Sequence, residues 1–282
     1  MAMSEELTSF YEEWAAHRAA DALLLDYVRK ADEWKWFHLE PLVRATGPVP
    51  QSVLEFGCGS AEMLELVSRA FPGAALAGID IAQGMIAMAR RRLPQARFEA
   101  GDIGHLAQGG FHSDLVLAVD ILEHLEDPVR CARALGTAGD RVALKIPLER
   151  RSIRLGLSRK PRIGTEHMSG HLHFWSLADS RRLLRDAGLE ILAETCADPP
   201  ESIRYHPAIF PAPPAPRAGD LIGFLRAAHR AFEVGLERWT CMHQSAMHRH
   251  LFGSSHFVVA RHAETVRVGA SAAPVGPGRS PR

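Results

Sequence analysis

The chain has 282 residues, of which 46% are hydrophobic and 23% are charged, and this excludes a largely disordered protein. The length suits one elaborated α/β domain. Lys and Arg together number 33, as do Asp and Glu, and this balance disfavours a protein held to nucleic acid or to a membrane by bulk positive charge. No apolar run approaches the roughly 18 residues of a membrane-spanning helix, so we expect no membrane contact.

The cysteines and the N-terminus both predict a cytoplasmic location. The four cysteines lie far apart and form no C-x-x-C pair, which indicates reduced thiols rather than a disulfide framework. The first residues are acidic and amphipathic, unlike a signal peptide.

The beginning of the chain has a helical pattern. Apolar and aromatic residues recur at helical spacing over residues 5–46, and we expect Pro41 to break this helix. Gly and Pro at residues 47–50 then end the helical pattern. We therefore expect residues 1–50 to form a helical lid in front of a domain that covers residues 51–262.

That domain alternates predicted strands with predicted helices. Short apolar runs predict strands at 52–56, 75–79, 97–100, 114–119, 141–147, 189–196 and 256–261. Amphipathic runs predict helices at 60–71, 83–92, 128–135 and 177–187. This alternation is typical of an α/β fold in which helices cover both faces of a mostly parallel, seven-stranded sheet.

The last part of the chain departs from this alternation. Residues 198–253 predict a helical insertion, with a proline-rich start and an amphipathic helix over 220–251. That helix could pack on the sheet domain or could cover a substrate pocket. The small, Pro- and Gly-rich residues 263–282 predict a disordered tail.

A glycine loop, Gly57-Cys58-Gly59, joins the first predicted strand to a helix. Glycines let the backbone bend sharply and approach a ligand closely. Acids accompany the loop at successive strand ends, where parallel sheets bind ligands: Glu55, Asp80, Asp102 and Asp120. Because Glu55 would repel a phosphate and attract an amine, the loop favours a cationic ligand. A dinucleotide-binding oxidoreductase is disfavoured, since Glu62 occupies the third glycine position of G-x-G-x-x-G.

Five ordered segments resemble motifs of the class I S-adenosylmethionine-dependent methyltransferases: LEFGCGSAEML, GIDIAQGMIAMAR, FEAGDI, DLVLAVDILEHLEDP and HLHFWSLADSRRLLRDAGLEIL. The one departure is Ala61, which replaces the usual third glycine. The resemblance implies a Rossmann-like methyltransferase fold with S-adenosylmethionine as cofactor.

The resemblance also implies roles for individual residues. It places the methionine moiety beside Gly57, Cys58 and Gly59, with Glu55 on its amino group. It implies that Asp80 binds the ribose and that Asp120 faces the methionine end. The adenine contacts it implies are Ile81, Met85, Asp102 and Ile103.

The acceptor side offers a carboxylate and two imidazoles. Methyl transfer requires mainly alignment, although a hydroxyl acceptor must also lose its proton to a base. We therefore take Glu123, His124 and His171 as candidate catalytic residues. L-E-H-x-x-D-P resembles the ubiquinone-biosynthesis O-methyltransferases, and the spacing also resembles small-RNA 2′-O-methyltransferases, which bind a divalent metal. That second resemblance implies a metal set of Asp120, Glu123, His124 and His171. We predict no metal, because the motif is widespread among methyltransferases that use none.

A basic segment over residues 149–162 is compatible with solvated surface or with an anionic acceptor. The sequence thus predicts methyl transfer to an oxygen or nitrogen of a small molecule in a bacterial biosynthetic pathway, and the basic segment makes an anionic acceptor one candidate. An RNA-modifying enzyme is the alternative.

Overall fold

The computed structural model describes residues 8–9, 11–13, 15–16, 21–108, 110–148, 171–204, 206–208 and 254–263. Its centre is a seven-stranded sheet in the order β3-β2-β1-β4-β5-β7-β6. The strands are β1 (Ser52–Phe56), β2 (Ala75–Asp80), β3 (Arg97–Ala100), β4 (Ser113–Val119), β5 (Gly139–Leu148), β6 (Leu189–Ala197) and β7 (Ser254–His262). Only β7 runs antiparallel to its neighbours, β5 and β6. The predicted fold class, Rossmann-like with a mostly parallel sheet, is confirmed.

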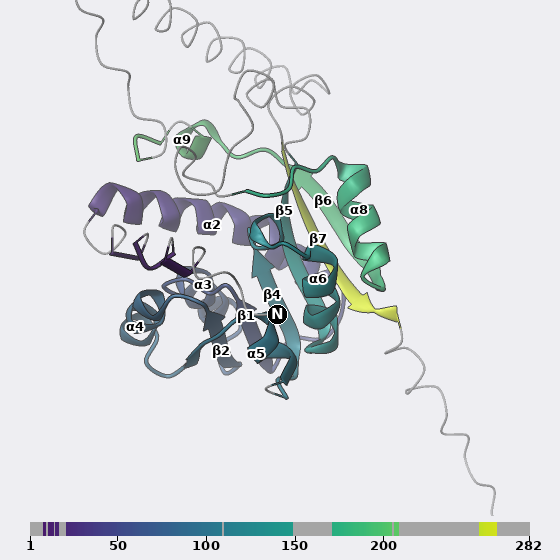
Figure 1. Ribbon diagram of the computed structural model, residues 1–282, viewed down its shortest axis with the longest axis horizontal. Coiled ribbons are helices and arrows are strands. Elements are labelled where there is room, and N and C mark those ends of the chain that lie inside the picture. Colours follow the sequence, from purple (N-terminus) through teal and green to yellow (C-terminus); the bar gives the residue numbers. More distant parts are fainter. Residues whose placement is uncertain are drawn as a thin grey trace, which may run out of the picture.

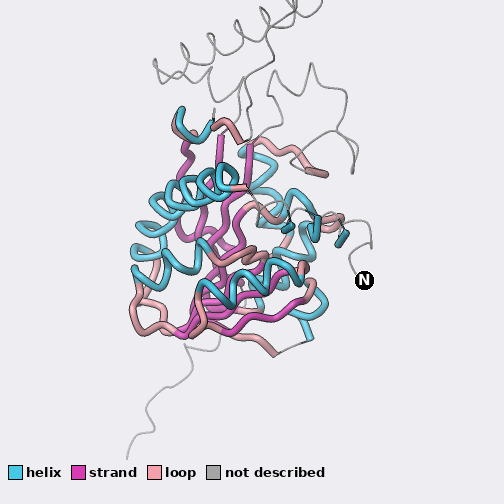
Figure 2. Tube along the Cα trace, turned by 90° about the vertical axis from the view of Figure 1, so that its left-hand side faces the viewer, coloured by secondary structure: helices cyan, strands magenta, loops and turns pink. Residues whose placement is uncertain are grey.

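Helices cover both faces of this sheet (Figures 1 and 2). One hydrophobic cluster contains residues of α2 (Ala22–Ala45), α3 (Glu62–Ala70) and α4 (Gln83–Arg92). The opposite cluster contains residues of α5 (Ile103–Gln108), α6 (Pro128–Thr137) and α8 (Leu177–Asp186). Two short turns, η1 (Leu122–His124) and α9 (Glu201–Arg204), complete the described elements.

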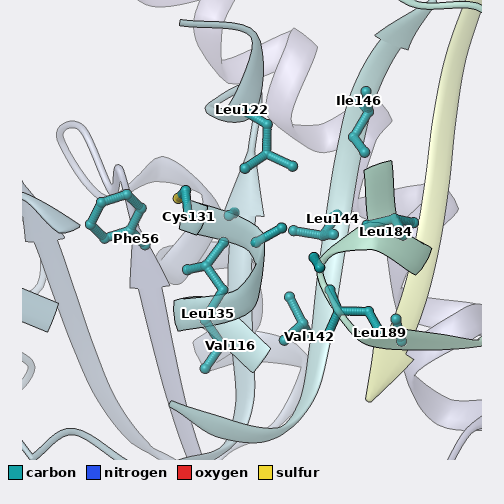
Figure 3. Packing of buried hydrophobic residues seen from close by; sticks show 14 of the residues in the cluster. Phe56, Val116, Leu122, Cys131, Leu135, Val142, Leu144, Ile146, Leu184 and Leu189 are labelled. Atoms are coloured by element: carbon teal, nitrogen blue, oxygen red, sulfur yellow. The ribbon is translucent and has the colours of Figure 1, made fainter. Parts of the chain in front are cut away.

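The central strands are apolar on both sides because both of their faces are buried. On β4, Leu115 and Leu117 belong to the cluster under α2 and α3, whereas Val116 belongs to the cluster under α6 and α8. Figure 3 shows this second cluster, in which Leu135 of α6 and Leu184 of α8 lie against strand residues. Helices therefore pack on both faces of the sheet, and this packing holds the strand ends in fixed positions.

Helix α2 corrects one prediction. It continues through Pro41 to Ala45, so the predicted break is wrong. Proline removes one backbone hydrogen bond, and Pro41 lies on the exposed side of the helix. Leu39 and Val43, on either side of it, are fully buried against the sheet layer and hold the helix in place. Residues 22–45 thus pack as a layer on the sheet, and a lid formed by residues 1–50 stays a prediction.

Helix α5 was missed because it is short and weakly periodic. The Asp102 carboxylate begins it by accepting a hydrogen bond from the His105 amide at 3.0 Å. The basic segment, most of the predicted insertion and the predicted tail lie outside the described residues. The described start of the insertion contacts α2, where His206 Nε2 lies 3.1 Å from the Asp26 carboxylate. Within the described parts of the chain, no helix is both long and apolar enough to span a membrane.

Candidate functional site

The glycine loop turns sharply between β1 and α3. Gly57 and Gly59 have φ values of 76° and 50°, a left-handed backbone that favours glycine. The amides of Gly57 and Cys58 both donate to the Ile79 carbonyl, at 2.7 and 3.0 Å, which ties the loop to β2. Ala61 also has a positive φ, 66°, at the position where the family usually has glycine. The loop therefore keeps the glycine-type bend at all three positions.

Asp80 ends β2 and fixes the loop from the side. Its carboxylate accepts hydrogen bonds from the Gly59 amide at 2.8 Å and from the Ala82 amide at 2.9 Å. A carboxylate has about four lone-pair positions, so these two contacts orient Asp80 and leave capacity for ribose hydroxyls. Asp80, the predicted ribose-binding acid, is thus held beside the glycine loop.

Glu55 is a buried acid, only 3% exposed. Burial raises its pKa well above the usual value, and the nearby carboxylates of Asp32 and Glu62 act in the same direction. Within the described residues, its Oε2 atom has no hydrogen-bond partner. A buried carboxyl group with unused acceptor capacity favours a cationic ligand that can bind it. The site therefore fits the ammonium group of S-adenosylmethionine.

The predicted adenine contacts lie next to these residues. Met85 is buried and packs beside Ala82, directly after β2. Ile103 packs against the core under α6, and Asp102 uses one oxygen to begin α5. Ile81 is half-buried at the end of β2. The structure thus brings the predicted adenine residues to one edge of the sheet, while their contacts with adenine stay predictions.

Asp120 pairs with two lysines, and its position at the methionine end of the cofactor stays a prediction. Its carboxylate binds Lys145 of β5 and, at 3.1 Å, Lys35 of α2. Burial acts to raise the pKa of Asp120, but the two lysines outweigh it and hold the pKa well below the usual range. Lys35 also pairs with Asp32 at 2.7 Å. Asp120 is therefore a neutralised anion at the end of β4, and no local pattern connects it with its lysine partners, which come from α2 and β5.

The three candidate catalytic residues lie together. Glu123 is fully buried in η1, and its Oε1 atom is 3.9 Å from Nε2 of both His124 and His171. The two imidazole centroids are 4.9 Å apart. Since the potential ligand atoms all lie within 4.8 Å of one another, this group could also hold a metal ion. We call Glu123, His124 and His171 the acceptor cluster.

Backbone contacts bring His171 to this position from a distant part of the sequence. The amides of Leu172 and His173 donate to the Glu123 carbonyl, at 2.7 and 3.2 Å. His173 Nε2 bonds the Leu125 carbonyl at 2.8 Å, and its ring stacks on Trp175. His173 is therefore a structural residue, and it anchors the segment that carries His171.

Sequence reasoning missed one aromatic residue beside the site. Tyr11 meets His124 edge-on, with the ring centroids 6.1 Å apart. Burial, then the charges of Glu123 and Asp80, raise the Tyr11 pKa far above its usual value. Helical spacing marked Tyr11 as one apolar residue among several, and nothing local in the sequence identified its partners.

Comparison with known families settles the superfamily. A family model described as a methyltransferase domain matches residues 24–194. The chain belongs to this methyltransferase family. The predicted membership of the class I S-adenosylmethionine-dependent methyltransferases is thus confirmed.

Curated relatives match parts of the chain. A trans-aconitate 2-methyltransferase of Methylobacterium nodulans is 35% identical over 142 residues, which are 48% of this chain and 54% of that protein. One from Variovorax paradoxus is 39% identical over 101 residues, 36% of this chain and 39% of that protein. The chain therefore spans about half, or less, of the length of these relatives.

Solved structures share the fold. Magnesium protoporphyrin IX methyltransferase from Synechocystis, with bound SAH, superposes with a TM-score of 0.55 at 16% identity and covers 90% of this chain and 98% of that one. The [4+2]-cyclase SpnF gives 0.52 at 20% identity, covering 82% of this chain and 81% of that one. Because one neighbour is a cyclase, the fold alone does not specify the reaction.

Proposed function

We propose that the protein transfers a methyl group from S-adenosylmethionine to an oxygen or nitrogen atom of a small molecule, with a carboxylic acid as the first acceptor to test. One observation carries this proposal. Glu55, which is buried, and Asp80, which two backbone amides orient, lie beside the glycine loop at the same sheet edge as the acceptor cluster. Family membership supports the reaction type, and the names of the curated relatives support an acidic acceptor.

The cofactor half of the site would bind and orient. S-adenosylmethionine supplies a methyl group already activated on a sulfonium. Glu55 would bind its ammonium group, because a buried carboxyl with spare acceptor capacity gains most from a cation. Asp80 would accept the ribose hydroxyls, since two backbone amides already fix its carboxylate. The bends at Gly57 and Gly59 would let the backbone approach the methionine moiety.

The acceptor half would align the second substrate. The Nε2 atoms of His124 and His171 both lie 3.9 Å from the same Glu123 oxygen, so one acceptor group could contact both rings. A carboxylate acceptor needs only this alignment, whereas a hydroxyl would lose its proton to one of the imidazoles. Glu123 would then stabilise the resulting imidazolium through its charge. We propose this chemistry without a metal ion.

Two further features accord with this proposal. The zero formal net charge of the whole chain favours a small acceptor over RNA. Free cysteines at Cys58 and Cys131, both buried, accord with a reducing cytoplasmic location. A role in bacterial biosynthesis is the pathway class that we propose.

A product assay tests the proposal. The purified protein is incubated with S-adenosylmethionine and single acceptors, among them trans-aconitate, other small carboxylic acids and phenols. Mass spectrometry then follows S-adenosylhomocysteine and the methylated product. We expect both products to form in equal amounts with at least one acid. Tight binding of NAD together with no binding of S-adenosylhomocysteine would overturn the assignment.

A further inference from the structure

Helix α4 is capped by a residue from the start of the chain. Ala82, which precedes the helix, contributes no capping side chain. Instead, Glu12 accepts a hydrogen bond from the Gln83 amide at 2.6 Å and another from the Gly84 amide at 3.1 Å. The carboxylate thus binds amides that have no partner inside the helix and meets the positive end of its dipole. In Figure 1 these first residues, in the darkest purple, lie between α2 and α4.

Apolar packing adds to this contact. Ala15 is 3% exposed and is buried together with Ala82 and Met85, and Tyr11 packs against the same cluster. A Cβ atom on Gly84 would lie only 3.0 Å from the Ala15 Cβ, so glycine at this position permits the close approach. The segment therefore sits on the residues that follow Asp80, in the cofactor half of the site.

The same segment also reaches the acceptor half. The Tyr11 ring meets His124 edge-on at 6.1 Å and an interplanar angle of 79°. The charges of Glu123 and of Asp80 both act on the Tyr11 phenol, so the phenol lies near each of these two acids. Among the described residues, Tyr11 is the side chain that links the residues after β2 with those after β4.

We propose that Tyr11, Glu12 and Ala15 form an N-terminal clamp that couples the two halves of the site: Glu12 fastens the clamp to α4, and Tyr11 thereby positions His124 for the acceptor. This proposal rests on the proposed function, which assigns one half of the site to the cofactor and the other half to the acceptor. The clamp gives an order of events, because the cofactor can leave only after Glu12 releases α4, and the acceptor half is complete only while Glu12 holds.

The first arm of the test measures how fast S-adenosylhomocysteine leaves the full-length protein. Glu12→Ala should increase its dissociation rate about tenfold, because charge-assisted hydrogen bonds that hold the clamp are lost. Glu13→Ala is the matched control, since Glu13 is the adjacent acid and its side chain is exposed. We expect the control to dissociate at the wild-type rate.

The second arm needs neither cofactor nor acceptor. NMR spectra of the imidazole C–H groups identify the His124 signal by its loss in His124→Gln. Tyr11→Leu removes the contact between the Tyr11 and His124 rings, and so gives the chemical shift that His124 has without this contact. We expect Glu12→Ala and the milder Glu12→Gln to move the His124 signal toward that chemical shift, although Glu12 contacts α4 rather than His124. Glu13→Ala should leave it unchanged.

The two arms separate the clamp from the proposed function. If the wild-type protein binds no S-adenosylhomocysteine, the proposed function fails, and the His124 signal of the unliganded protein still decides the clamp. An unchanged His124 signal in both Glu12 variants would overturn the coupling, whatever the dissociation rates. An unchanged dissociation rate in Glu12→Ala would overturn the role of Glu12 as the fastener.

Discussion

Two of the groups in which the structure pairs a glutamate with histidine differ in spacing. At the sheet edge near α8, Ser180 Oγ lies 2.9 Å from His256 Nδ1, and His256 Nε2 lies 2.9 Å from the Glu194 carboxylate. In the acceptor cluster, Glu123 lies 3.9 Å from each imidazole nitrogen. The first group is a closed chain of hydrogen bonds, whereas the second is too widely spaced for direct bonds between these atoms.

The difference shows why residue types alone do not identify a catalytic site. Ser180, His256 and Glu194 have the composition of a hydrolase triad, but Ser180 and His256 are both 0% exposed. No substrate can reach such a serine, so this group joins α8 to β6 and β7. The acceptor cluster follows β4 at the carboxyl edge of the sheet, where parallel sheets bind ligands.

The largest effect should follow from removing an imidazole of the acceptor cluster. His124→Ala and His171→Ala should each lower turnover by about 10²–10⁴-fold with a hydroxyl acceptor, because the proton acceptor is lost. Affinity for S-adenosylhomocysteine should stay near wild type in calorimetry. His112→Ala is the control, since His112 is exposed and pairs with Asp140 outside the acceptor cluster. Full activity in both cluster variants would leave alignment by other residues as the source of catalysis.

The lysine pair of Asp120 should control stability. Lys145→Met should reduce the free energy of unfolding by about 2–3 kcal/mol, somewhat less than the full loss of a buried pair, because Lys35 still compensates Asp120. Chemical denaturation measures the change. Lys30→Met is the matched control, since the Lys30 side chain is 41% exposed against 10% for Lys145, and its pair with Asp26 should contribute at most about 1 kcal/mol. Equal losses of unfolding free energy in Lys145→Met and Lys30→Met would show that the environment of Asp120 does not strengthen its ion pair.

His256 should make stability depend on pH. Burial lowers its pKa below the usual value, and the hydrogen bond to Glu194 opposes this only in part. Below about pH 6.5 the unfolded chain therefore binds a proton that the folded protein excludes, and stability should fall as the pH decreases. The slope from this residue should be at most about 1.4 kcal/mol per pH unit. Denaturation at several pH values should show a shallower slope in His256→Gln than in wild type or His112→Gln.

A chelator should have the smallest effect. Methyl transfer from an activated sulfonium needs no Lewis acid, so EDTA should leave turnover unchanged. Loss of activity on chelation, with recovery on adding magnesium, manganese or zinc, would instead assign Glu123, His124 and His171 to a metal.

Much of the fold and the cofactor half could be predicted because their signals are local. The strand that Gly57 follows and the strand that ends in Asp80 each have their own apolar pattern and their own predicted ligand residue. Helix α4 was predicted with the bounds that it has, since Asp80 ends the preceding strand and Pro94 follows the helix. The helix break predicted at Pro41 was wrong, because packing of Leu39 and Val43 in the core outweighs the low helix propensity of proline.

The partners of the polar residues could not be predicted, because they come from distant segments. Asp120 pairs with Lys35 across the fold, and Glu12 caps a helix that begins 71 residues later. His171 reaches Glu123 only because backbone amides beside it bind the Glu123 carbonyl. Such contacts depend on the three-dimensional arrangement, and no spacing in the sequence encodes them.

Calorimetric titration with S-adenosylhomocysteine tests the central claim most directly, using wild type, Asp80→Ala and the control Asp140→Ala, whose carboxylate is exposed. Wild type and the control should bind it, and Asp80→Ala should bind at least about tenfold more weakly, because hydrogen bonds to a charged group contribute roughly 1.5–3 kcal/mol each. Thermal melting checks that the variant is folded. An equal dissociation constant for all three proteins would show that Asp80 lies outside the cofactor site and would contradict the account.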